Sequence, residues 1–301
     1  MTARAVIDGR FELRGPLGKG SAAEVLLAHD RARGDACCIK RIGLGRDDVV
    51  DRFVAEIATL TAIDCAHIVP VRAYGADDDG VWYAMDLMAG SLADKSPRGE
   101  PLDPLRVTRW MIHALVGLES LHRRGIVHRD VKPGNLLYDR EGYIKVADLG
   151  LARHADGSVN FRTRPDVGMG TPSFAAPEII RDAHSADHRA DLYGIGVTFF
   201  ALTSGQSADR FVLHTMEPSI LDDAPEAFVP ALKQLGASKP EGRPENARAA
   251  VSLLCDAADH YAMAHDRERR GAFWMTLFDR LMPPLGLQAW VRSKLWHLGL
   301  R

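Results

Sequence analysis

The polar loop at residues 128–135 narrows the possible folds and chemistry of this chain more than any other segment. Its sequence is His-Arg-Asp-Val-Lys-Pro-Gly-Asn, which places a carboxylate, two cations and an amide within one short turn. Asp130 can accept a proton from a hydroxyl, and Lys132 can neutralise a phosphoryl oxygen. Asn135 offers an oxygen of the kind that magnesium prefers. A solvated surface turn has little use for this combination, so the loop predicts a reaction centre.

Two further segments fit the same chemistry. The tripeptide Asp-Leu-Gly begins at Asp148, directly after an apolar strand pattern, where a second oxygen ligand is needed. Near the amino terminus, Gly18 and Gly20 lie in the sequence Leu-Gly-Lys-Gly-Ser-Ala-Ala-Glu-Val. Glycines let backbone N–H groups approach a polyphosphate closely. By itself this glycine pattern is equally typical of a plain turn between two strands.

Hydrophobic periodicity divides the chain into two parts. Before Asp103, short strand patterns surround a single helical pattern, and after it the apolar spacing is mostly that of long helices. Residues 11–18 are predicted to form a strand followed by a turn. Further strands are predicted over 24–29, 36–40, 69–74, 81–86 and 144–148, and helices over 48–62, 104–124, 191–203 and 244–265. We therefore expect a small β-rich lobe, a hinge near residues 87–91 and a larger helical lobe.

Composition excludes several other classes of protein. A length of 301 residues suits one large domain or two lobes, and 46% hydrophobic with 26% charged residues is an ordinary globular balance. A net charge of −2 gives no sign of a nucleic-acid partner. The four cysteines contain no Cys-x-x-Cys pair, which argues against a disulfide framework or a zinc site. No signal peptide or membrane span is evident, so a cytoplasmic location is expected.

Taken together, the motifs resemble those of the eukaryotic-type (Hanks-type) serine/threonine protein kinases. The resemblance runs from about Phe11 to Leu254, with the motifs in the family's order. It implies a bilobal α+β protein kinase fold, with an N-lobe at 11–86, a hinge at 87–91 and a C-lobe at 92–258. It also implies ATP and Mg²⁺ as cofactors and a Ser or Thr hydroxyl of a protein substrate as acceptor.

The resemblance assigns roles to individual residues. Lys40 stands where the family has a lysine that contacts the α- and β-phosphates, and Glu56 stands where its ion-pair partner lies. Asp130 is similar to the catalytic base that orients the acceptor hydroxyl, and Lys132 to the lysine at the γ-phosphate. The residues implied in nucleotide binding are Leu17, Gly18, Gly20, Val25, Lys40, Met85 at the gatekeeper position, Asp86 and Met88 in the hinge, and the magnesium ligands Asn135 and Asp148.

Residues 170–178, Gly-Thr-Pro-Ser-Phe-Ala-Ala-Pro-Glu, resemble the end of a kinase activation segment. In the family, the residue corresponding to Thr171 bridges the catalytic aspartate and lysine and favours Ser or Thr acceptors. Glu178 would be buried and need a cationic partner, which Arg243 supplies by the resemblance. This pair is expected to be structural.

The loop before that segment carries the implied regulatory residues. Arg129 corresponds to an arginine that often pairs with a phosphorylated activation loop in the family. Thr163 lies between Arg162 and Arg164, which can cradle a phosphate. We therefore predict that Thr163 is an autophosphorylation site, the alternative being an exposed polar loop.

The C-terminal segment, residues 259–301, is unexplained by the resemblance. Its last part, residues 266–301, has a net charge of +4 and holds three of the five tryptophans, Trp274, Trp290 and Trp296. A basic segment with tryptophans can lie on an anionic membrane surface, which would place the chain at the periphery of the inner membrane. Docking on the large lobe or on another protein is the other interpretation.

Two other functions compete with a signalling protein kinase. No implied catalytic residue is missing, which disfavours a weakly active or inactive scaffold that works through its tail. The Thr-Pro at Thr171 and the Ala-Pro-Glu that ends at Glu178 resemble a peptide-binding platform, which disfavours a kinase of small molecules. A content of 30 arginines and 8 lysines, with many alanines, is typical of a bacterial source.

Overall fold

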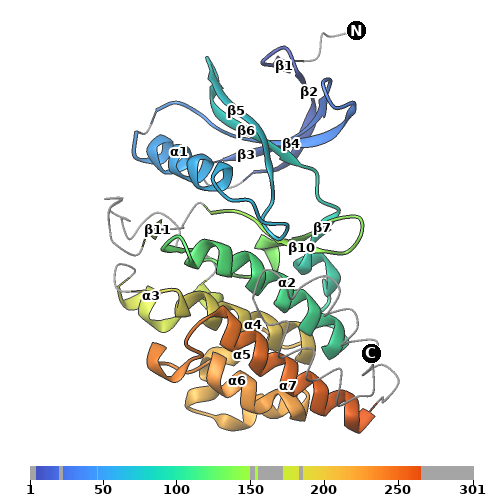
Figure 1. Cartoon of the computed structure of the whole chain (residues 1–301), viewed down its shortest axis with the longest axis vertical. Coiled ribbons are helices and arrows are strands. Elements are labelled where there is room, and N and C mark those ends of the chain that lie inside the picture. Colours follow the sequence, from blue (N-terminus) through green and yellow to red (C-terminus); the bar gives the residue numbers. More distant parts are fainter. Residues whose placement is uncertain are drawn as a thin grey trace.

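The computed structural model describes residues 5–19, 23–45, 47–149, 153–154, 172–182 and 186–265. A strand-rich part comes first in the chain and a helical part follows it, as Figure 1 shows. We call the part up to Asp86 the N-lobe and the part after it the C-lobe. The predicted order of a β-rich lobe and a helical lobe is confirmed.

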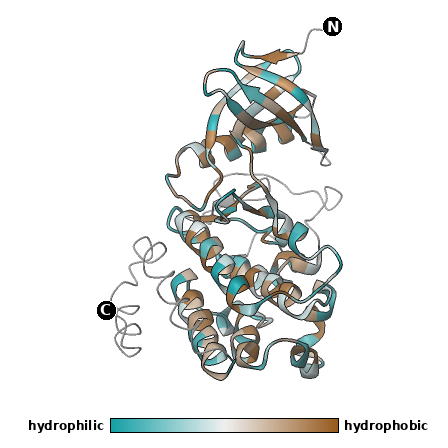
Figure 2. Ribbon diagram, turned by 90° about the vertical axis from the view of Figure 1, so that its right-hand side faces the viewer, coloured by the Kyte–Doolittle hydropathy of each residue, from teal (hydrophilic) through white to brown (hydrophobic). Residues whose placement is uncertain are grey.

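The N-lobe is an antiparallel sheet with one helix beside it. Its six strands lie in the order β1-β2-β3-β4-β6-β5. The elements are β1 (Val6–Ile7), β2 (Phe11–Lys19), β3 (Glu24–Asp30), β4 (Asp35–Ile42), α1 (Asp47–Thr61), β5 (Val71–Asp77) and β6 (Gly80–Asp86). In Figure 2 these strands carry both apolar and polar residues. The pattern of β3 alternates in burial, whereas β4 and β6 each contain three consecutive buried residues.

Helix α1 packs on the sheet through one face. Phe53, Ile57 and Leu60 recur at helical spacing and are buried, and Glu56 lies on the same buried face. The ring of Phe53 lies 5.3 Å from the ring of Tyr83 on β6. The apolar face thus carries a carboxylate into the interior of the N-lobe.

Strand β2 differs from the sequence prediction. It continues to Lys19 through the glycine segment, where a turn was expected, and β1 precedes it. Its pairing with β3 is irregular around Gly15 and Gly18, and Gly15 has a φ of 152°. Because β1 pairs only with Phe11 and Glu12, the outer edge of β2 at Pro16 faces no strand among the described residues. Proline and glycine are tolerated at such an edge.

The C-lobe contains the long helices and several short strands. Its helices are α2 (Pro104–His122), α3 (Pro177–Arg181), α4 (Arg189–Ser204), α5 (Ala208–Val212), α6 (Val229–Leu235) and α7 (Ala247–His265). Its strands are β7 (Gly90–Ser91), β8 (Ile126–Val127), β9 (Leu136–Tyr138), β10 (Ile144–Val146) and β11 (Arg153–His154). Its 3₁₀ turns are η1 (Leu92–Lys95), η2 (Pro133–Asn135), η3 (Pro172–Phe174), η4 (Leu213–Thr215), η5 (Pro218–Asp223), η6 (Glu226–Phe228) and η7 (Pro240–Gly242).

The ends of the long helices follow local sequence. Asp103 caps α2 by accepting a hydrogen bond from the backbone N–H of Arg106, and Pro104 occupies the first turn. Helix α4 is buried on nearly all sides and ends at Gly205, whose φ is 71°. No helix in the described ranges is long and apolar enough to cross a membrane. The basic segment at 266–301 lies outside those ranges.

Several backbone contacts join the two lobes. The bridge Ile68↔Val146 runs parallel, and the backbone N–H of Val69 donates to the carbonyl of Val146 at 3.1 Å. After β6 the chain enters the C-lobe within a few residues, because β7 at Gly90–Ser91 pairs with β9. The link between lobes is therefore short.

Candidate active site

A buried ion pair lies between the sheet and helix α1. The Nζ of Lys40, on β4, donates to Oε1 of Glu56 at 2.7 Å. The side chain of Glu56 is 2% exposed and that of Lys40 is 11% exposed. Burial alone would lower the pKa of Lys40, but the nearby charge of Glu56 raises it well above its usual value. Lys40 therefore stays charged, and the pair is costly to break.

The same lysine reaches the C-lobe. Its Nζ also donates to Oδ1 of Asp148 at 3.0 Å, and the carboxylate of Asp148 is half exposed. Asp148 follows β10 with a φ of 63°, a left-handed conformation that a residue with a side chain rarely adopts. Lys40, Glu56 and Asp148 thus form one connected group that spans both lobes.

The loop at residues 128–135 gathers its polar groups around Asp130. The Nζ of Lys132 donates to Oδ2 of Asp130 at 2.8 Å. The Nδ2 of Asn135 donates to the backbone carbonyl of Asp130 at 2.8 Å and to its Oδ2 at 2.9 Å. The carboxylate of Asp130 is therefore held by two donors from its own loop, the ammonium group of Lys132 and the amide group of Asn135.

Asp191, on α4, fixes the backbone of that loop. It is 1% exposed, and its two oxygens accept from the backbone N–H groups of His128 at 2.9 Å and Arg129 at 2.7 Å. His122 contacts the same carboxylate at 2.7 Å. Burial would raise the pKa of Asp191, but these donors lower it, so the carboxylate stays charged. The hydrogen bonds hold Arg129 at a φ of 69°.

His128 and Gly194 also support the backbone of the loop at residues 128–135. The backbone N–H of Asp130 donates to Nδ1 of His128, so the other ring nitrogen carries the proton and donates to the carbonyl of Ala147 at 3.0 Å. A Cβ on Gly194 would lie 2.8 Å from both the Cβ and the carbonyl oxygen of Val131. Glycine is needed there because α4 packs directly on the loop.

A second ion pair anchors the segment after η3. Arg243 is fully buried, and it grips both oxygens of Glu178 at 2.5 and 2.8 Å. Its guanidinium lies 5.0 Å from the centre of the Tyr193 ring. This bidentate contact is the one expected from the sequence, and it is distant in sequence from the loop at 128–135.

The comparisons with known proteins agree with this geometry. The family described as "Protein kinase domain" matches residues 11–220, well over half of the chain. This chain belongs to the protein kinase family. The prediction of a Hanks-type serine/threonine kinase fold is confirmed.

Three relatives illustrate the similarity. A probable serine/threonine-protein kinase of Streptomyces coelicolor is 34% identical over 229 residues, covering 73% of this chain and 32% of the relative. The DNA damage-responsive serine/threonine-protein kinase of Deinococcus radiodurans is 30% identical over 285 residues, covering 89% and 42%. CBL-interacting protein kinase 29 of Oryza sativa is 36% identical over 219 residues, covering 67% and 48%. This kinase domain spans about a third to a half of the length of these relatives.

The residues predicted for nucleotide binding lie on the facing strands of the N-lobe and at its exit. Leu17 and Gly18 are on β2, and Gly18 pairs with Val25 on β3, which in turn pairs with Lys40. Met85 and Asp86 end β6. Met88 follows in the link to the C-lobe. Three predicted residues lie outside the described part of the chain: Gly20, Thr163 and Thr171.

Asn135 and Asp148, the two predicted magnesium ligands, lie near each other in the fold. The backbone carbonyl of Asn135 accepts from the N–H of Ala147, which places it next to Asp148 in the fold. The amide nitrogen of Asn135 donates to the carboxylate of Asp130, so its amide oxygen is not engaged by that carboxylate. In the described part of the chain, no three His, Cys, Asp or Glu side chains gather as a metal site. Two hard oxygens completed by phosphates are what magnesium uses in kinases.

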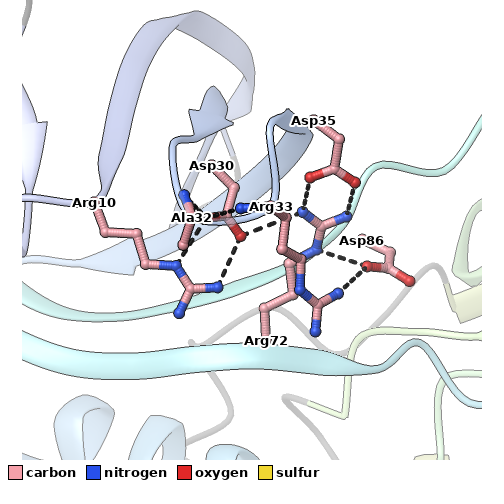
Figure 3. A network of polar contacts seen from close by, with 7 residues as sticks. All are labelled: Arg10, Asp30, Ala32, Arg33, Asp35, Arg72 and Asp86. Carbon is pink, nitrogen blue, oxygen red and sulfur yellow. Dashed lines mark hydrogen bonds and ion pairs between the residues drawn. The ribbon is translucent and has the colours of Figure 1, made fainter.

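Sequence reasoning missed two polar residues that touch the predicted site. Tyr83 donates a hydrogen bond to Oε1 of Glu56 at 2.8 Å. Arg72, which is 5% exposed on β5, donates from Nε to Asp86 at 2.7 Å and from both Nη atoms to Asp35 at 2.6 and 2.9 Å (Figure 3). Arg10 and Arg72 also contact the buried Asp30. A polar residue inside an apolar strand pattern was the one available signal for both.

Proposed function

We propose that this kinase domain transfers the γ-phosphoryl group of ATP to Ser or Thr hydroxyls of proteins. The observation that carries the proposal is the connected set of Lys40, Glu56, Asp148 and the Asp130 loop, with every charged group held by a partner. Catalysis of this transfer needs positioning and charge stabilisation more than covalent chemistry. The arrangement supplies both.

Each residue has a distinct task in the proposed reaction. Asp130 orients the acceptor hydroxyl and takes its proton, and its carboxylate is held for this by Lys132 and Asn135. Lys132 also stabilises negative charge on the transferred group, and Lys40 holds the α- and β-phosphates. A magnesium ion bound by Asn135 and Asp148 would neutralise charge on the phosphates.

The nucleotide would lie between the lobes. We propose that the adenine is held by Leu17, Val25, Met85 and the backbone of Asp86 and Met88, with Gly18 and Gly20 over the phosphates. The hinge would be residues 87–91, between an N-lobe at 11–86 and a C-lobe at 92–258. The exit of β6 at Asp86 and the early pairing of β7 support a short hinge.

We also propose how the domain is regulated and where in the cell it acts. Bacterial relatives support a role in bacterial signalling. Thr163 would be an autophosphorylation site read by Arg129, and Thr171 would link Asp130 to Lys132. We further propose a cytoplasmic location, because the cysteines in the described part are free thiols, which fits a reducing compartment. Residues 266–301 would contact a protein or the inner membrane surface.

The test is transfer of label from γ-labelled ATP in the presence of Mg²⁺. The wild-type chain is expected to label itself or a general protein acceptor on Ser or Thr. Asp130→Asn removes the proton acceptor while keeping the size of the side chain, and a loss of about 10²–10⁴-fold in kcat is expected. Asp78→Asn, an exposed change in the turn between β5 and β6, is the matched control.

The outcomes of this test separate the competing functions. Mapping of the label shows whether Thr163 is modified. ATP binding without transfer by the wild-type chain would contradict the proposal and favour a scaffold that acts through its tail. Transfer to small hydroxyl compounds but not to protein would favour a small-molecule kinase.

A further inference from the structure

Tyr83 lies at the centre of the contact between the sheet and helix α1. It is on β6, directly across from Lys40 on the neighbouring strand β4. Its hydroxyl donates to Oε1 of Glu56 at 2.8 Å, and the Nζ of Lys40 donates to the same oxygen at 2.7 Å. One carboxylate oxygen on α1 therefore receives donors from two adjacent strands.

The surroundings of the Tyr83 hydroxyl keep it protonated, so that it acts as a hydrogen-bond donor. Tyr83 is 2% exposed and Glu56 is 4% exposed. The ring of Phe53 packs on one side, and the Nζ of Lys40 lies 5.7 Å from the centres of both aromatic rings. Burial raises the pKa of Tyr83 well above its usual value, so the phenol keeps its proton. A buried hydroxyl that lost Glu56 would be left without a charged partner, which is costly.

The two donors of Glu56 differ in what else they must do. Lys40 already shares its ammonium group with Asp148, and in the proposed reaction it must also hold phosphates. Tyr83 has no such second task, because its ring is fixed in the sheet between Lys40 and Phe53. The hydrogen bond from Tyr83 therefore holds α1 against β6 whether or not the side chain of Lys40 moves toward Asp148 or the phosphates.

We propose that Tyr83 is a positioning residue of this kinase domain, whose hydroxyl holds Glu56, and with it α1, in the place from which Glu56 orients Lys40. The inference rests on the proposed function for its kinetic consequence, but the tie between α1 and β6 exists without turnover. Loss of the hydroxyl shifts the population toward a state in which α1 is displaced. ATP can then bind productively only to the remaining fraction.

The variant Tyr83→Phe removes the hydroxyl and keeps the ring against Phe53. We expect the KM for ATP to rise about tenfold or more, because a hydrogen bond to a charged group is lost. At saturating ATP, kcat should stay within about twofold and the KM for the protein acceptor should not change, because nucleotide selects the competent state. A general loss of folded enzyme would lower kcat and leave the KM for ATP unchanged.

Two comparisons make the assignment specific. Tyr74→Phe removes a phenol from the adjacent strand β5, where the side chain is 62% exposed, and should leave both constants unchanged. In a Glu56→Gln background, Tyr83→Phe should raise the KM for ATP less than about threefold, because the charged acceptor is already gone. Full additivity of the two changes would contradict an action of Tyr83 through Glu56.

Hydrogen exchange tests the inference without catalysis. In the full chain, amides of α1 (Asp47–Thr61) should exchange about tenfold faster in Tyr83→Phe, while those of α2 (Pro104–His122) stay unchanged. If the wild type transfers no phosphate but α1 loosens in the variant, the proposed function fails and this inference stands. Wild-type exchange of α1 together with a wild-type KM for ATP would overturn it. Should Tyr83→Phe not fold, Tyr83→Met is measured in the same way.

Discussion

At the scale of single residues, Asp148 connects the two lobes of the proposed site. It accepts from Lys40 across the lobes, it holds a left-handed backbone conformation, and in the proposed site it offers an oxygen to magnesium. Asn135 lies beside it through the hydrogen bond to Ala147. If these two side chains are the only protein ligands of the proposed magnesium ion, each one is indispensable for binding it.

We therefore predict that Asp148→Asn strongly weakens the binding of magnesium. The amide keeps an oxygen that can accept from Lys40, but it loses the negative charge that holds a divalent ion. The Mg²⁺ concentration for half-maximal transfer, measured at fixed total ATP, should rise at least about tenfold. The exposed Asp78→Asn serves again as control, and an unchanged magnesium curve would remove Asp148 from the metal site.

Contacts between motif residues could be predicted from the sequence, whereas contacts made by isolated residues could not. Lys40 with Glu56, and Glu178 with Arg243, were expected because the family resemblance fixes both partners. Tyr83 was missed because its contact depends on the register of β6 against β4, which places it beside Lys40. The roles of the motif residues in binding and transfer stay predictions.

At the scale of elements, a pair of histidines joins α2 to β10, the strand that leads to Asp148. His113 accepts from the backbone N–H of Ile144 at 3.1 Å, and His67 contacts the carbonyl of the same residue at 2.7 Å. The two rings lie 4.7 Å apart, and Tyr143 stacks on His113. Burial lowers the pKa of both histidines, that of His113 to about 3, helped by the nearby positive charges.

This pair predicts a loss of stability in mild acid. A histidine with a folded pKa below its unfolded value of about 6.5 binds protons more readily when unfolded, so its contribution is complete above about pH 6.5 and falls as the pH drops toward 3. For His113 alone, the free energy of unfolding should fall by about 2 kcal/mol between pH 7 and pH 5. The measurement is urea unfolding at both pH values.

The matched variant for this prediction is His113→Asn, whose side-chain oxygen can still accept from Ile144. In this variant the free energy of unfolding should lose the part of its pH dependence that comes from His113. The part that comes from His67 should remain. Arginine partners lower the pKa of Asp30 and of Asp35, so these two carboxylates add little in this window. An undiminished pH dependence would show that other groups carry it.

The arginine cluster of Figure 3 braces the end of β6 against the hairpin of β3 and β4. Arg72 joins Asp86 to Asp35 and to Asp30, whose side chain is fully buried. Hydrogen bonds from Arg10 lower the pKa of Asp30, so it stays charged and needs its cations. Asp86, at the end of β6 and next to the proposed hinge, is thus fixed from outside the proposed nucleotide site.

Removing this brace should destabilise the N-lobe. We predict that Arg72→Met lowers the free energy of unfolding by about 2–3 kcal/mol, less than a fully buried pair because Asp35 is half exposed. Arg31→Met is the control, because Arg31 is half exposed and contacts Glu12 only at 3.8 Å, and its effect should stay within about 0.5 kcal/mol. Equal losses in urea unfolding would mean that the cluster contributes no more than surface charge.

At the scale of the whole molecule, the two-lobed order was predictable because most strand patterns lie in the first third of the sequence and most helix patterns lie after it. Less could be predicted where periodicity is weak. The region after α4 consists of short helices and 3₁₀ turns from Ala208 to Leu235, which leave no long apolar repeat to detect. Strand β1 was missed because two residues carry no period at all.

The placement of Lys40 in one lobe and Asp148 in the other predicts that nucleotide stabilises the molecule as a unit. A non-hydrolysable ATP analogue with Mg²⁺ at about 100 times its Kd should add about 2.7 kcal/mol to the free energy of unfolding. For a chain of 301 residues that is a rise of roughly 4 °C in Tm.

The same measurement shows whether both lobes are needed. Lys40→Met should lose most of the rise in Tm, because the buried Glu56 then has no ammonium to present to the phosphates. The analogue without Mg²⁺ should give a smaller rise than with it, since Asp148 would then face the phosphates without an intervening cation. A full rise in Lys40→Met would place the nucleotide away from this ion pair, and the proposed site would be wrong.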